Sequence, residues 1–295
     1  IHSCSDFPMD GNKVVNSLTD ALKKVGIKDG MTISSHHHFR NGDLVMNNIF
    51  DICHKLSIKG LRWFPSATFP CHAPIIDYMR NGTVDLVEGS LNGDIGRFVS
   101  YGDMAKIGVL RSHGGRWQAV QDGEVHIDIA IISAPTADPF GNSTGDRGPS
   151  ACGSLGFALV DSLYADKVIV VTDNLVPFPC IPWQIQGQNV DHVVVVDKIG
   201  NPAKIVSRTT AITLSKEKLG IAEMTAKFVK AAGIIKNGFS FQAGAGGISL
   251  AFLKYVKKVM KDTNVKARFI RGGSTKEMVE MLEEGLTDYI LDGQA

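Results

Sequence analysis

Three uninterrupted apolar runs are the feature that most constrains the fold of this chain. They are DIAIISA (128–134), KVIVVTD (167–173) and HVVVVDK (192–198), and they are rich in Val and Ile. A strand with one face in water alternates apolar and polar residues. These runs do not alternate, so both faces of each strand are expected to be buried. Strands of this kind belong to parallel sheets that are covered on both faces, which predicts a layered α/β fold.

Shorter strand-like and helical segments extend this pattern through the first two-thirds of the chain. The first helix is predicted from Val14, Leu18, Leu22 and Val25, which recur at helical spacing, and Gly26 can end it in a left-handed cap. Further strands are expected at 31–36, 61–66 and 83–89, and a further helix at 44–56.

The alternation of strands and helices restarts near residue 208, which predicts two domains. Residues 1–208 form the first α/β domain, and residues 209–295 contain the start of a second one. About three strands are expected in the second domain, fewer than an average sheet contains, so it is predicted to be incomplete in this sequence. Its expected elements are helices at 215–235, 248–260 and 274–285 and strands at 239–242, 265–270 and 286–291.

Composition and charge exclude several classes of protein. Hydrophobic residues make up 44% of the chain and charged residues 21%, as in globular proteins, and 31 basic residues nearly balance 30 acidic ones. No apolar run reaches the ~20 residues of a membrane-spanning helix, and no secretory signal pattern opens the sequence. Neither nucleic acid nor a membrane is therefore an expected partner. Five scattered cysteines without a CxxC pair favour a reducing cytoplasm over a disulfide framework or a zinc ribbon.

Three consecutive histidines follow the strand expected at 31–36. On an extended backbone His36 and His38 point one way and His37 the other, so the three cannot converge on one tetrahedral metal ion. His36 and His38 could supply two ligands if Asp43 or a distant residue completed the site, but no strong metal spacing such as HExxH occurs. We therefore expect no metal here.

An anion pocket fits this segment better than a metal site. Imidazole N–H groups, the Arg40 guanidinium and the amides of the Asn41–Gly42 turn are donors that suit a carboxylate. A polar strand end whose histidines are satisfied within the protein remains the alternative.

A glycine-rich loop lies between the strand expected at 239–242 and the helix expected at 248–260. Bare backbone N–H groups beside a positive helix end suit a phosphate or a developing oxyanion. The loop is not a Walker A motif, because no Gly-Lys-Ser/Thr follows. It nearly matches GxGxxG, with Ser249 in the third glycine position, but the next strand leads to Arg271 where a dinucleotide fold places an acidic residue. An NADP-type oxidoreductase and a tight structural turn therefore remain alternatives.

Other residues give weaker signals. Cys152 could begin the helix that follows it, which would lower the pKa of its thiol, although a small buried thiol is the simpler expectation. Glu88 and Asp94 follow a predicted strand and could act as acid or base, but turn or cap roles are more common for such residues. No GxSxG elbow is present, so serine hydrolase chemistry is unsupported.

Four segments, in order along the chain, resemble the alpha subunit of citrate lyase, a citrate CoA-transferase. The resemblance covers nearly the whole sequence, and the HHHFR segment and the GAGG loop are more specific together than either is alone. It implies a CoA-transferase-like (NagB/RpiA-type) α/β fold with layered, largely parallel sheets and a site in the cleft between two domains. The segments are GMTISSHHHFRNGD (30–43), GDIGRFVSYGDMAKIGVLRSHGGR (93–116), SAPTADPFGNSTG (133–145) and FQAGAGGISLA (241–251).

The resemblance also implies a reaction and partners. An acyl-carrier thioester passes from acetate to citrate, which gives citryl carrier and free acetate. A separate beta subunit then cleaves citryl carrier to oxaloacetate and acetyl carrier. The carrier is a gamma subunit with a phosphopantetheine-derived prosthetic group, and free acetyl-CoA can replace it in part. The chain is thus expected to bind no cofactor of its own and to work in an oligomeric, cytoplasmic complex.

The resemblance assigns site residues by position. No glutamate matches the covalent nucleophile of other CoA-transferases, so no catalytic residue is assigned, and family alpha subunits are markedly longer than this chain. Citramalate is an alternative acceptor, and a non-catalytic ligand-sensing module of the same fold is an alternative function. The implied carboxylate binders are His36, His37, His38 and Arg40, and the implied thioester or CoA binders are Gln242, Gly244, Ala245, Gly246 and Gly247.

Overall fold

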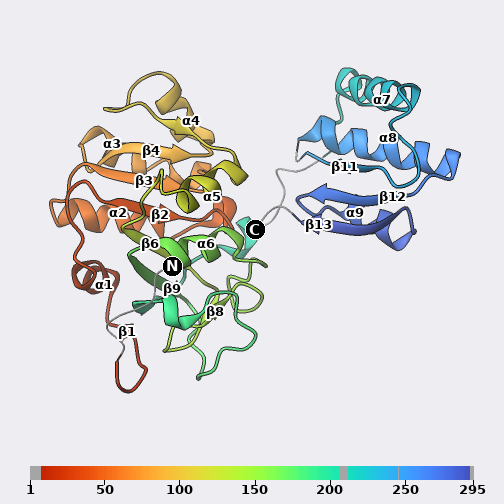
Figure 1. The fold of residues 1–295 in the computed structure, drawn as a ribbon. Helices are drawn as coiled ribbons and strands as arrows, with labels where there is room; N and C mark the ends of the chain where they lie inside the picture. The colour runs from red at the N-terminus through yellow and green to blue at the C-terminus, as the bar shows by residue number, and fades with distance from the viewer. Residues whose placement is uncertain (1–7, 206–211, 245, 293–295) are drawn as a thin grey trace. The chain divides into compact units, whose positions relative to one another are not determined.

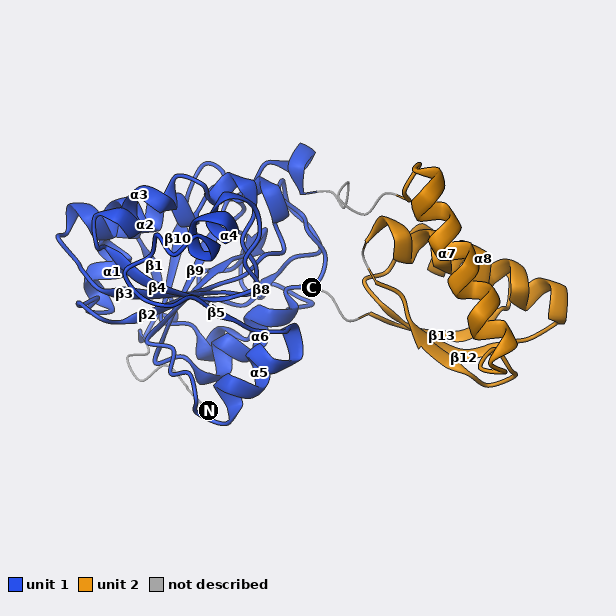
Figure 2. Cartoon of the chain, turned by 90° about the horizontal axis from the view of Figure 1, so that it is seen from above, with its two compact units in different colours: residues 1–206, 295 blue, residues 207–294 orange. Residues whose placement is uncertain are grey.

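The computed structural model describes residues 8–205, 212–244 and 246–292. The chain divides into two compact units, unit 1 over residues 1–206 and unit 2 over residues 207–294 (Figure 2). The domain boundary expected at 208/209 lies outside the described residues, and each unit is described here by itself.

Unit 1 is built on an eight-stranded sheet with the order β1-β10-β9-β6-β2-β3-β4-β5, in which every neighbouring pair is parallel (Figure 1). The three apolar runs form β6, β9 and β10, so the prediction of a parallel sheet is confirmed. A short antiparallel pair, β7 (Thr136–Ala137) and β8 (Ser143–Thr144), lies outside this sheet. The sheet strands are β1 (Val14–Val15), β2 (Thr32–Ser35), β3 (Leu61–Pro65), β4 (Val84–Gly89), β5 (Val109–Leu110), β6 (Ile129–Ser133), β9 (Lys167–Thr172) and β10 (His192–Val195).

Helices cover both faces of this sheet, with α1, α2 and α3 on one face and α5 and α6 on the other (Figure 2). Alternate residues of a strand point to opposite faces, so Ile131 packs in the core under the first group and Ile132 in the core under the second. The helices are α1 (Leu18–Lys24), α2 (Met46–Lys55), α3 (Ile75–Arg80), α4 (Gly93–Ser100), α5 (His113–Gln121) and α6 (Gly156–Tyr164).

The order of strands contains a topological switch point between β2 and β6. From β2 the chain moves outward through β3, β4 and β5, and it then returns to place β6 on the other side of β2. In open parallel sheets, ligands bind outside the carboxyl ends of the strands at such a point. The fold therefore directs attention to the residues that follow Ser35 and Ser133.

The first predicted helix is shorter than expected. It begins after Ser17, whose hydroxyl oxygen accepts the Asp20 N–H, and Gly26 follows its end with φ +73°. The assignment of Val14 to this helix is wrong, because Val14 lies in β1 and pairs with Val193 of β10. The spacing of apolar residues could not show whether Val14 lies in an edge strand or in the first turn of the helix. The N-cap Ser17 marks where α1 begins.

Unit 2 has a three-stranded parallel sheet with the order β11-β12-β13. Its core includes Leu253 and Val256 of α8, Ile270 of β12 and Met278 of α9. No helix in the described ranges is long and apolar enough to cross a membrane. The elements are α7 (Lys216–Ala231), β11 (Ser240–Gln242), α8 (Gly247–Thr263), β12 (Ala267–Gly272), α9 (Lys276–Glu283) and β13 (Thr287–Asp292), in the predicted sequence of helices and strands.

Candidate functional site

The three histidines lie at the switch point, directly after β2. All three are buried, and each is held by a different neighbour that comes from a strand end or a helix on one face of the sheet. The rings of His36 and His38 stack with centroids 6.1 Å apart, whereas His37 packs against His113 and Phe157. His36, through Asp161, and His37, through His113 and Phe157, both contact the side covered by helices α5 and α6, so the prediction that the two rings lie on opposite sides of an extended backbone is not confirmed.

His36 is anchored by a fully buried ion pair. Its Nε2 lies 2.8 Å from Asp161 Oδ2, and Arg116 grips the same carboxylate through two nitrogens at 2.9 and 2.7 Å. Burial alone would raise the pKa of the Asp161 carboxyl, but the charges of Arg116 and His36 hold it well below its ordinary value. Since the carboxylate can only accept, His36 donates through Nε2–H.

His38 is held in the same tautomer by a different acceptor. Its Nε2 lies 2.7 Å from the Ser133 carbonyl oxygen at the end of β6, which can only accept a hydrogen bond. Burial and the neighbouring His36 lower the pKa of His38 to about 4, so the ring is neutral near pH 7. The Nδ1 atoms of His36 and His38 are buried and have no hydrogen-bond partner among the described residues.

These contacts show which ring nitrogens the protein itself engages. Nε2 of His36 and Nε2 of His38 face Asp161 and Ser133, and Nδ1 of the neutral His38 ring carries a lone pair. A lone pair does not attract a carboxylate, so neutral His38 has no free donor, whereas the role of the histidine segment in carboxylate binding stays a prediction. Sequence could not show these partners, because Asp161 and Ser133 are distant along the chain.

His37 differs from its neighbours in having an N–H group left over. The Ser66 hydroxyl oxygen accepts the His37 backbone N–H at 2.9 Å and lies 2.6 Å from Nδ1 of the ring. In the tautomer in which the Ser66 O–H donates to Nδ1, the ring proton lies on Nε2. Burial and the neighbouring His113 lower the pKa of His37, so the ring is a neutral donor. Within the described residues, no group accepts a hydrogen bond from its Nε2.

Arg40 supplies the positive charge beside His37. Its guanidinium is half-buried, has no hydrogen bond or ion pair within the described residues, and is close enough to help lower the pKa of His37. Its backbone adopts φ +52°, an uncommon conformation for a residue with a side chain. The Arg40 N–H donates to the His37 carbonyl at 2.8 Å, which closes the turn on the histidines.

The turn that carries Arg40 is fastened to the end of unit 1. Asn201 donates its N–H to the Gly42 carbonyl at 2.9 Å, and Leu44 donates to the Ile199 carbonyl at 3.1 Å. A Cβ added to Gly42 would lie 2.8 Å from the Asn201 carbonyl oxygen, so this close approach requires glycine.

The glycine-rich loop of unit 2 begins the long helix α8. Gln242 ends β11, and Gly246 is the N-cap of the 17-residue helix. Gly246 is exposed, and an added Cβ would meet nothing within 4 Å. Ala245 lies outside the described residues. The expectation that this loop shares a cleft with the histidines concerns the arrangement of the two units and stays a prediction.

Three other candidate residues have structural surroundings. Cys152 lies before α6 rather than at its first turn, and burial and Asp146 raise the pKa of its thiol to about 12, so the idea of a lowered pKa is wrong. Glu88, in β4, is buried and paired with Arg62 and Arg111. Asp94 lies in the first turn of α4 and pairs with Arg97.

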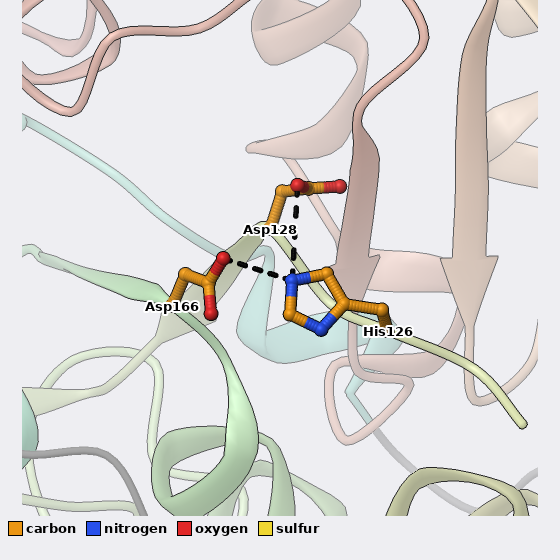
Figure 3. Close-up of side chains that lie close together, drawn as sticks. All are labelled: His126, Asp128 and Asp166. Carbon is orange, nitrogen blue, oxygen red and sulfur yellow. Dashed lines mark hydrogen bonds and ion pairs between the residues drawn. The ribbon is translucent and has the colours of Figure 1, made fainter. Parts of the chain in front are cut away.

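A separate cluster lies at the opposite, amino ends of the strands (Figure 3). His126 and Asp128 precede β6, and Asp166 precedes β9. His126 Nε2 lies 2.8 Å from Asp166 Oδ2 and 3.9 Å from Asp128 Oδ1, and Asp128 also accepts the Thr32 N–H at the start of β2. These ion pairs and the strand contact account for the cluster without a ligand.

Comparison with known proteins identifies the family of this chain. The model of the citrate lyase alpha subunit family (CitF) matches residues 11–295. The chain belongs to this family. The citrate lyase alpha chains of Escherichia coli K12 and Klebsiella pneumoniae are 39% and 38% identical to it over 284 residues, which is 96% of this chain and 56% of each relative. This member of the citrate lyase alpha subunit family therefore spans a little over half the length of these relatives.

Solved structures agree with the family assignment. One solved structure is the putative alpha subunit of citrate lyase from Streptococcus mutans in complex with citrate. It matches this chain with a TM-score of 0.92 and 43% sequence identity, and the match covers 99% of this chain and 58% of the S. mutans chain. An acyl-CoA transferase from E. coli O157:H7 matches with a TM-score of 0.59 and 14% sequence identity, over 96% of this chain and 69% of the transferase chain. At this low identity the match shows only that the fold is CoA-transferase-like. The family match favours the transferase over the oxidoreductase and sensor alternatives.

Proposed function

We propose that this protein is the citrate CoA-transferase subunit of citrate lyase, which moves an acyl-carrier or CoA thioester from acetate to citrate. Family membership supports the reaction, and the S. mutans relative supports the ligand, since it is described in complex with citrate. The observation that carries the proposal is the Arg40 guanidinium, which has no partner within the described part of the chain, beside His37 at the carboxyl end of β2.

In the proposed carboxylate site, Arg40 and His37 bind the ligand, and His36 and His38 support them. Arg40 provides the charge and a bidentate fork for one carboxylate of the acceptor. His37, kept neutral by burial, adds a directed N–H. His36 and His38, whose N–H groups are engaged by Asp161 and Ser133, shape and rigidify the pocket.

The thioester side is proposed for the glycine-rich loop. The exposed Gly246 and the partly buried Gly247 at the start of α8 offer backbone N–H groups and a positive helix end to an acyl oxyanion or a pantetheine arm. The proposed partners are the acyl-carrier gamma subunit, with its phosphopantetheine-type group as substrate, and the lyase beta subunit. No resident cofactor is required for this transfer.

Calorimetric titration with citrate tests the site directly. Arg40→Gln removes the charge and shortens the side chain to a polar amide, and the loss of a charge-assisted hydrogen bond worth about 1.5–3 kcal/mol should weaken citrate binding roughly 10- to 100-fold. Arg80→Gln, at an exposed arginine of the same unit, is the matched control and should bind citrate as the unmodified protein does. Equal affinity in the Arg40 and Arg80 variants would remove Arg40 from the site.

An exchange assay in the full-length protein tests the thioester side. Gly246→Val has open space for its side chain, so the fold should be unaffected. The KM for acetyl-CoA should rise while citrate binding stays unchanged. A variant with an unaltered KM would argue against the loop as the thioester cradle.

A further inference from the structure

We propose that Asn41 and His72 are positioning residues for Arg40, and that they hold the turn at Arg40 in the conformation that presents its guanidinium to a carboxylate. This inference rests on the proposed function, because it names further residues that the same acceptor site needs. The expected anion pocket gave Asn41 a role only through its backbone amide, and it gave His72 none.

The backbone of Arg40 is the observation that motivates this inference. Its φ is +52°, in the left-handed region that residues with a side chain rarely adopt. Such a conformation is unfavourable on its own and persists only when the surrounding structure imposes it, and residues of this kind concentrate at ligand sites. The contacts that impose this conformation on the turn are therefore expected to matter for what Arg40 binds.

A short 3-10 helix, η2 (Pro70–His72), contacts the turn through Cys71. The Cys71 backbone N–H donates to Asn41 Oδ1 at 2.8 Å. The Cys71 thiol donates to the carbonyl oxygen of Arg40, with 3.5 Å between Sγ and that oxygen. Loss of the Asn41 side chain would leave the Cys71 N–H without its acceptor and would weaken the hold of η2 on the backbone of Arg40.

His72 holds the end of the same turn through Asp43. Both side chains are buried, and the N–H at Nε2 of His72 donates to Asp43 Oδ2 across 3.2 Å, since a carboxylate can only accept. Asp43 Oδ1 accepts the Val45 N–H at 2.7 Å, just before α2. Burial alone would raise the pKa of Asp43, but the hydrogen bond from His72 and the backbone N–H groups lower it. The carboxylate therefore ties the residue at which the turn ends to both η2 and α2.

The place of the Arg40 guanidinium depends on the backbone that carries it. The group is half-buried and has no hydrogen bond or ion pair within the described residues, so no neighbouring side chain fixes it. Asn41 is only partly buried, whereas His72 also packs edge-on against the buried Trp63, with ring centroids 5.6 Å apart. Loss of Asn41 should therefore disturb the turn without disturbing the core, and loss of His72 tests the same role from the other end of the turn.

A double-mutant cycle for citrate binding, measured by calorimetric titration of the full-length protein, tests the role of Asn41. Asn41→Ala removes the acceptor of the Cys71 N–H and should weaken citrate binding about 3- to 10-fold, as expected for one hydrogen bond. In an Arg40→Gln background it should cause no further loss, because the group that it positions is already absent. Asn237→Ala is the matched control, because it removes an Oδ1 that accepts the Lys266 N–H at 2.9 Å in unit 2, and it should leave citrate binding unchanged.

His72 gives a second cycle with a conservative variant. His72→Phe keeps an aromatic ring against Trp63 and removes the N–H that Asp43 accepts, so it should also weaken citrate binding at least about 3-fold. His72→Gln retains an N–H donor and should recover part of this loss. The effect of His72→Phe should again vanish in the Arg40→Gln background. Urea unfolding of each variant reports any separate effect on stability, which the Arg40→Gln background would not remove.

The outcomes separate this inference from the proposed function. Equal losses of citrate affinity with and without Arg40 would overturn the positioning role, because the variants would then act on binding by another route. Unchanged affinity in Asn41→Ala or in His72→Phe would overturn it for that residue and leave the proposed function intact. An unmodified protein that does not bind citrate, or an Arg40→Gln variant that binds it normally, would instead overturn the proposed carboxylate site and, with it, this inference.

Discussion

The pH dependence of stability offers a quantitative test of the buried histidines. The pKa of His38 is about 4 in the folded protein and 6.5 for an ordinary histidine. Between these two values the unfolded chain binds a proton that the folded chain does not, so stability falls as the pH falls through this window. The two pKa values differ by about 2.5, which corresponds to about 3 kcal/mol lost between pH 6.5 and pH 4.

Urea unfolding of unit 1 measures this loss. All three tryptophans, Trp63, Trp117 and Trp183, belong to unit 1, so tryptophan fluorescence reports on that unit alone. His38→Gln retains an N–H donor for the Ser133 carbonyl but cannot titrate. The difference in unfolding free energy between the unmodified protein and this variant should therefore change by about 3 kcal/mol across the window.

Other titrating groups are present in both proteins, so the difference reports on His38 together with its charge coupling to His36 and His37. His37, whose pKa is also lowered by burial, remains in the variant, and the Asp161 carboxylate loses its stabilising effect only at a more acidic pH. A difference that stays constant from pH 6.5 to pH 4 would show that His38 is not held neutral by burial, and the tautomer argument for the site would fail with it.

Two further predictions concern buried groups away from the site. Glu88→Ala should lower the free energy of unfolding of unit 1, measured by urea titration, by about 2 kcal/mol. It leaves the partly exposed Arg62 and Arg111 without the carboxylate that they share. The control Glu124→Ala removes only an exposed partner of Arg111 and should change the free energy of unfolding by less than about 1 kcal/mol. Cys152 should resist alkylation by iodoacetamide at pH 8 in the folded protein, since its thiol pKa is about 12, and rapid labelling detected by mass spectrometry would contradict its burial.

The fold was largely predictable from local patterns. The Val and Ile runs identified β6, β9 and β10, because strands that are buried on both faces do not alternate apolar and polar residues. The renewed alternation of helical and strand-like segments after residue 208 predicted the elements of unit 2. Val14 was misplaced because a two-residue edge strand is too short to show a period. The order of strands, and so the switch point, depends on pairings between distant segments that no local pattern contains.

The position of the histidine segment after a strand was predictable, but the partners of its ring nitrogens were not. The residue types of the histidine segment suggested an anion pocket, and the structure places them at the carboxyl end of β2. Which ring nitrogens are free depends on Asp161, Ser133 and Ser66, and none of these is near the histidines in sequence.

The contact between the Arg40 turn and residues 199–201 joins two segments that are far apart in the sequence. Asn201 approaches Gly42, two residues after Arg40, too closely for any side chain at that position. A substitution that separates Gly42 from Asn201 would therefore disturb the turn that carries Arg40, although neither residue is a proposed ligand contact.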